Sequence, residues 1–155
     1  MKLGGAILLL GCGLAWAGMK NRDEQADIAR VAAFGELFAR VGERIEGLCL
    51  PLDEILASLP PPLLTACGLT YGAGEMAHLH AAVERVRDRE AADILAQTAA
   101  QLGRGTSGDQ VRLCRSAAER LQCCRERMAG AWTNNARARV TLVMSAVLGG
   151  IILLW

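Results

Sequence analysis

The stretch "VAAFGELFARVGERIEGL", Val31 to Leu48, decides the fold of this chain. Its apolar side chains step by 3, 4, 3, 4 and 3 residues, a spacing that places them along one face of a helix. No proline interrupts the pattern before Pro51. We therefore expect an amphipathic helix from Asp23 onward, into which an apolar helix at the start of the chain can continue as a stalk. The apolar stripe comprises Val31, Phe34, Phe38, Val41, Ile45 and Leu48.

Proline and glycine divide the segment that follows. Pro51 begins a short predicted helix, Leu52–Leu59, and the prolines at 60–62 end it because proline lacks an amide donor and clashes with the preceding turn. A brief helix from Leu63 to Cys67 is expected next. The stretch "GLTYGAGE", residues 68–75, reads as a loop.

Two further amphipathic helices are predicted on either side of "GRGTSG", Gly103–Gly108. The first is one long helix from Met76 to Leu102, with "ERVRDRE" on its solvated face, and the second is capped by Ser107 or Asp109. Because no strand pattern is convincing, we expect an all-α chain with a small antiparallel bundle in its middle. The stripe of the last helix is Val111, Cys114, Ala118, Leu121, Cys124, Met128 and Trp132.

Both ends of the chain are free of charged residues. Neither Leu3–Met19 nor Val140–Trp155 contains Asp, Glu, Lys or Arg. A helix of such length reaches about 25 Å, a little under the ~30 Å hydrocarbon core of a bilayer. We expect an N-terminal transmembrane helix over 1–19, a helical domain over 20–139 and a C-terminal transmembrane helix over 140–155.

The basic residues beside these segments predict an orientation. Lys20 and Arg22 follow the first segment, Arg137 and Arg139 precede the second, and only Lys2 lies beyond the first. The positive-inside rule then places the middle in the cytoplasm and both termini outside.

A cleaved N-terminus is the competing interpretation. Ala15–Ala17 fits an A-x-A cleavage site after a basic start and an apolar run, and "LLGC", Leu9–Cys12, approaches a lipoprotein pattern. The chain would then be a signal-peptide-processed or lipid-anchored envelope protein with a C-terminal membrane anchor. Whether Met1–Met19 is retained separates the two interpretations.

Composition argues against two further classes of protein. A formal net charge of +1 and only six aromatic residues do not suggest a nucleic-acid binder. No ionisable residue lies inside either apolar segment, whereas transport subunits usually carry such residues along their ion paths.

No catalytic, cofactor or metal site is expected. The six cysteines lack C-x-x-C spacing, and Cys114 and Cys124 fall on the apolar stripe as small hydrophobic residues. His78 and His80 are two apart, so they point to different faces of a helix. The G-x-G-x-x-G letters at Gly103–Gly108 follow a predicted helix rather than a strand, and no phosphate-binding G-x-x-x-x-G-K-[ST] occurs. We therefore expect neither enzymatic activity nor a small-molecule substrate.

Four stretches, taken in their order along the chain, together resemble one known family. "MKLGGAILLLGCGLAWAG" looks like that family's opening span, and "ELFARVGERIEGLCLPLDEIL", Glu36–Leu56, is similar to its helix that runs into a Pro-Leu turn. "LGRGTSGDQVRLCRSAAERL" resembles its signature of Leu-Gly, a polar loop and Gln, and "VLGGIILLW" looks like its closing span. The matching positions are Glu43, Ile45, Pro51, Leu52, Glu54, Leu102, Gly103 and Gln110. The family that these stretches resemble is the stage III sporulation protein AB family of endospore-forming bacteria.

The resemblance implies a non-enzymatic scaffold in the mother-cell membrane of a sporulating bacterium. The family belongs to a secretion-like apparatus between mother cell and forespore, and its cytoplasmic part is similar to the helical platform domain of type II secretion and type IV pilus inner-membrane proteins. By implication, the bundle docks a cytoplasmic secretion-type ATPase and other membrane components of the same complex.

The expected partner interface is the polar turn and the start of the last helix. Arg104 is expected to be exposed there and able to pair with an acidic partner, although the turn is equally compatible with a plain connector. The family loop usually reads Leu-Gly-x-Ser-Asp, whereas Gly105 and Thr106 stand at the last two places here, which leaves the role of the loop's acid open. The interface residues are Leu102, Gly103, Arg104, Asp109 and Gln110.

Overall fold

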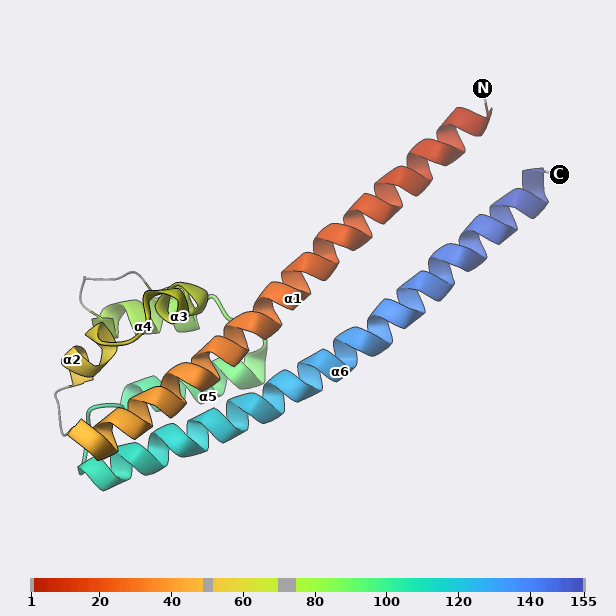
Figure 1. Cartoon of the computed structure of the whole chain (residues 1–155). Coiled ribbons are helices and arrows are strands. Elements are labelled where there is room, and N and C mark those ends of the chain that lie inside the picture. The colour runs from red at the N-terminus through yellow and green to blue at the C-terminus, as the bar shows by residue number, and fades with distance from the viewer. Residues whose placement is uncertain (1, 49–51, 70–74, 155) are drawn as a thin grey trace. The chain divides into compact units, whose positions relative to one another are not determined.

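The structure, a computed structural model, describes residues 2–48, 52–69 and 75–154 and consists of helices throughout that part of the chain (Figure 1). No strand occurs among the described residues, so the all-α class is confirmed. The helices are α1 Lys2–Leu48, α2 Leu52–Ala57, α3 Pro61–Cys67, α4 Glu75–Val83, α5 Arg89–Gln101 and α6 Ser107–Leu154.

The chain divides into two compact units. One is continuous, Asp27–Arg127, and the other combines Met1–Ala26 with Met128–Trp155. These borders lie closer to the middle of the chain than the expected domain borders at 19/20 and 139/140, so α1 and α6 each contribute to both units.

The core of the Asp27–Arg127 unit begins with the predicted stripe of α1. Val31, Phe34, Phe38 and Val41 are fully buried, and Ile45 is half-buried. The side chain of the last stripe residue, at position 48, lies outside the described residues. Four of the six expected stripe positions therefore form the centre of the core.

Segments of α1 and α6 pack closely and antiparallel within this unit. A Cβ built on Gly35 would lie 3.8 Å from the Cβ of Leu121, and one on Gly42 would lie 3.2 Å from the Cβ of Cys114. As the residue number increases along α1, the residue number of the contacting position on α6 decreases, so the two segments are antiparallel. Such close approach leaves little room for a side chain at Gly42. The side chains of Cys114, Leu121 and Cys124 are buried on α6.

The prediction of a single helix from Met76 to Leu102 is wrong. This stretch is divided into α4 and α5 by residues 84–88. Asp88 caps α5, because its Oδ1 accepts a hydrogen bond from the amide of Ala91 at 2.9 Å. Both Val83 and Val86 are still buried, so the apolar stripe continues across a break in the backbone.

Proline has a second role at the start of α3. Residues 61 and 62 lie in its first turn, where a missing amide donor costs no helical hydrogen bond. The helix therefore starts two residues before the expected Leu63. It ends as expected at Cys67, followed by Gly68 with a φ of 78°, which satisfies the last carbonyls.

The second unit, Met1–Ala26 with Met128–Trp155, has its own polar contacts. Trp132 Nε1 donates to Asn21 Oδ1 at 2.6 Å, and an Arg139 guanidinium nitrogen lies 2.8 Å from Glu24 Oε1. Most side chains of the expected membrane segments lie outside the described residues.

Within the part of the chain that the structure describes, no helix is both long enough and apolar enough to cross a bilayer.

Candidate functional site

All five expected interface residues lie in the turn between α5 and α6 or directly beside it. Gly103 and Gly105 have φ angles of 81° and 95°, in the left-handed region that favours glycine. Gly103 also lies close to α2, because a Cβ there would be 3.9 Å from Leu52 Cδ2. The two glycines let the chain reverse within a few residues.

Gln110 holds this turn in one shape. Its side-chain Oε1 accepts from the amide of Gly103 at 2.9 Å, and its Nε2 donates to the carbonyls of Gln101 and Arg104. The residue is only 8% exposed. Because all of these partners are backbone groups, the buried amide replaces hydrogen bonds that the turn cannot make internally.

The first turn of α6 is closed by reciprocal side-chain bonds. Thr106 Oγ1 accepts from the amide of Asp109 at 3.3 Å and donates to Asp109 Oδ2 at 2.6 Å. Arg112 adds a 2.7 Å contact to Oδ1 of the same carboxylate. The hydrogen bond from Thr106, followed by that from Arg112, lowers the pKa of Asp109. Thr106 rather than the expected Ser107 or Asp109 therefore occupies the cap position, and Asp109 is its reciprocal partner.

The five expected interface residues separate into two groups. Leu102 and Gln110 are buried, and Gln110 serves the turn itself, whereas Gly103, Arg104 and Asp109 are exposed. Asp109 is already engaged by Thr106 and Arg112. Among the described residues the Arg104 guanidinium forms no ion pair. Its positive charge can therefore pair with an acidic group of a partner. The assignment of a partner to this turn stays a prediction.

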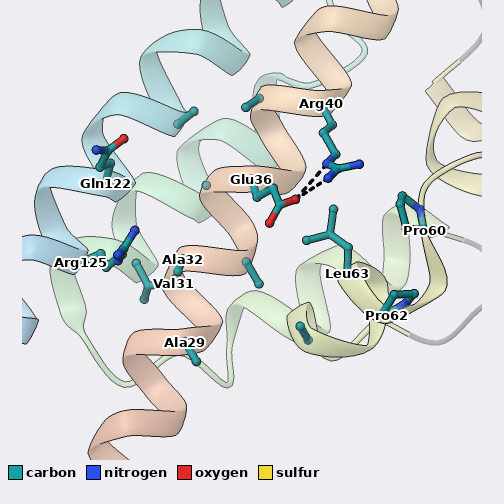
Figure 2. A pocket seen from close by; sticks show the side chains of 15 residues that line it. Ala29, Val31, Ala32, Glu36, Arg40, Pro60, Pro62, Leu63, Gln122 and Arg125 are labelled. Carbon is teal, nitrogen blue, oxygen red and sulfur yellow. Dashed lines mark hydrogen bonds and ion pairs between the residues drawn. The ribbon is translucent and has the colours of Figure 1, made fainter.

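A groove that was not predicted from the sequence lies in the same unit. It has a volume of about 710 Å³ and is bounded by α1, by α3 with the proline preceding it, and by α6 (Figure 2). Small α1 residues at positions 29, 32, 35 and 39 form the floor, and Pro60, Pro62 and Leu63 form one wall. Gln122 and Arg125 of α6 stand on the opposite side in Figure 2.

A second, smaller hollow of about 210 Å³ continues along the same pair of helices. It shares Ala39, Ala118 and Gln122 with the first groove, so the two are one trough along the contact between α1 and α6. We call this trough the α1–α6 groove. A sequence signal for it existed: small residues at 32, 35, 39 and 42 step by 3, 4 and 3.

The described cysteines and the described histidine side chain suggest no further site. Cys67 and Cys114 are fully buried, and burial raises the pKa of the Cys67 thiol to about 12 and that of Cys114 to about 11. His80 is exposed. Among the residues that the structure describes, no cluster of three potential metal ligands occurs. Positions 12 and 78 lie where side chains are not described, and Cys49 is outside the described residues.

Comparison with protein-family models, with curated proteins and with solved structures found no match to this chain.

Proposed function

We propose that this chain is a non-enzymatic scaffold, held in a membrane by its two charge-free ends, whose helical unit docks a cytoplasmic partner. The resemblance stated above suggests the setting: the mother-cell membrane of a sporulating bacterium, within a secretion-like apparatus that includes a cytoplasmic secretion-type ATPase. The proposal extends to other membrane components of the same complex. It includes no nucleic acid, no cofactor and no small-molecule substrate.

The shape of the α5–α6 turn is the observation that carries the proposal. Here Gln110 bonds to three backbone groups, and Thr106 and Asp109 close the helix end beside it. The turn is therefore already ordered before a partner binds, which reduces the loss of conformational entropy on binding.

Arg104 is the charged group that this turn presents. An exposed ion pair contributes only about 0.2–1 kcal/mol, so the arginine selects an acidic partner rather than supplying most of the affinity. Apolar contact must supply the remainder. Leu52, close to Gly103 and half-buried, lies where such a contact would extend from the turn.

The test is capture of the ATPase by full-length protein in solubilised membranes. We expect Arg104→Glu to reduce capture about fivefold, because an attractive exposed pair of about 0.2–1 kcal/mol is replaced by repulsion. Arg120→Glu is the matched control, since Arg120 is an exposed arginine on α6 away from the turn. Gln110→Ala should also weaken capture, although it removes no charge.

Two results would contradict the proposal. One is equal capture by Arg104→Glu and the unchanged protein, and the other is equal loss with Arg120→Glu. Circular dichroism of each variant shows that the helices are retained.

A further inference from the structure

The α1–α6 groove is unfilled because its floor consists of residues with almost no side chain. Ala29 and Ala39 are exposed, and Ala32 and Gly35 are half-buried, although they lie on a helix whose other face carries the core. Apolar walls stand beside this floor on α3, as Figure 2 shows at Pro62 and Leu63. A trough of this kind accepts side chains from outside.

The dimensions of the groove fit one face of a helix. Its lining on α1 extends from Ala29 to Glu46. At 1.5 Å per residue this stretch is about 25 Å long, or between four and five helical turns. Recognition of an amphipathic helix by an apolar groove uses anchors spaced i, i+3, i+4 and i+7.

A small molecule fits the same groove less well. Pockets for small molecules bring a few polar groups together at depth. The charged pair within this groove, Glu36 and Arg40, is exposed and already internally bonded, with Arg40 Nε 3.0 Å from Glu36 Oε1. Figure 2 shows this pair facing the α3 wall.

The two hollows of the groove carry opposite charge. Arg125 lines the first hollow, whereas Glu43 and Glu119 line the second. All three are exposed, and none forms an ion pair among the described residues. The remaining charges largely cancel, because Glu36 pairs with Arg40 and Glu46 lies 3.9 Å from Arg115.

We propose that this groove binds an amphipathic helix of a partner protein, with an acidic first turn on Arg125 and a basic last turn on Glu43 and Glu119. Helices commonly carry acids in their first turn and bases in their last, because these complement the helix dipole. The bound helix therefore runs in the same direction as α1. This surface is separate from the Arg104 turn, and the proposal does not depend on the ATPase.

Designed peptides test the proposal against the full-length chain in lipid nanodiscs. The first peptide is a labelled 17-residue helix with one alanine and leucine face, three glutamates in its first turn and three lysines in its last. The second peptide has the same apolar face with the two charged turns exchanged. Fluorescence anisotropy reports binding, and empty nanodiscs supply the background.

Two sets of variants locate the bound peptide. Ala39→Leu fills the floor at the point shared by both hollows, and Ala96→Leu makes the same change at an exposed alanine of α5. The triple variant Arg125→Glu, Glu43→Lys and Glu119→Lys reverses the charge in both hollows. All variants are compared by circular dichroism and thermal melting.

We expect the first peptide to bind several-fold more tightly than the second, and the triple variant to reverse that preference. Ala39→Leu should weaken binding about tenfold, whereas Ala96→Leu should not. Equal affinity for both peptides, or binding indifferent to Ala39→Leu, overturns the proposal. Sedimentation that shows a dimer dissociated by Ala39→Leu also overturns it, because a second copy of the chain would then be the occupant.

Discussion

At the scale of single residues, burial decides which thiols can react. Cys67 and Cys114 are enclosed by the core, whereas Cys123, next to buried Cys124, is exposed on α6. Burial, with a smaller effect from Glu36, raises the pKa of Cys67 to about 12. The thiolate is the reactive form, so both the burial of Cys67 and its raised pKa disfavour reaction there.

Alkylation of the native full-length protein should therefore be selective. At pH 8 a thiol with a pKa of about 12 is thiolate in about one molecule in ten thousand. We expect iodoacetamide to modify Cys123 and to leave Cys67 and Cys114 unmodified until urea is added. Peptide mass spectrometry measures each site separately. Alkylation of Cys67 as fast as Cys123 in the native protein would show that the core is open.

At the scale of elements, α5 depends on Asp88. Its carboxylate caps the helix through the Ala91 amide and also accepts two 2.8 Å hydrogen bonds from Arg127 on α6. Loss of an N-cap costs about 1 kcal/mol, and an exposed ion pair contributes less. The cap is therefore the larger of the two contributions.

Two substitutions at this position separate the contributions. We expect Asp88→Ala to lower the free energy of unfolding by about 1–2 kcal/mol. Asp88→Asn keeps a capping oxygen but loses the charge, so it should cost less than half as much. Thermal unfolding followed by circular dichroism measures both. Equal losses would mean that the contact with Arg127, rather than the cap, stabilises α5.

The same helix shows where sequence patterns succeed and where they do not. The stripe of α1 could be predicted because large apolar residues recur at a strict spacing. The break before α5 was missed because Val83 and Val86 continue the apolar stripe, although Glu90 interrupts it and Asp88 offers a cap. The position of the candidate turn could be predicted from the sequence. The hydrogen bonds between Gln110 and backbone groups could not, because they depend on the path of the turn.

At the scale of the whole molecule, the main question is which compartment contains the Asp27–Arg127 unit. The charge-free ends and the arginines beside them predict a cytoplasmic location, and a cleaved or lipid-modified N-terminus predicts the outside. The groove and the Arg104 turn belong to this unit, so their partners must lie in the same compartment. Membrane placement remains a prediction, and it decides between the two interpretations of the chain.

Cys123 provides a native reporter of that compartment, because it is exposed within this unit. We expect a membrane-impermeant maleimide to leave Cys123 unlabelled in intact cells and to label it once the cells are permeabilised. Cys123→Ser identifies the signal, and a cysteine added after Trp155 should be labelled in intact cells if the C-terminus is outside. Labelling of Cys123 in intact cells would place the unit outside, where it could not meet a cytoplasmic ATPase, and would favour the envelope protein instead.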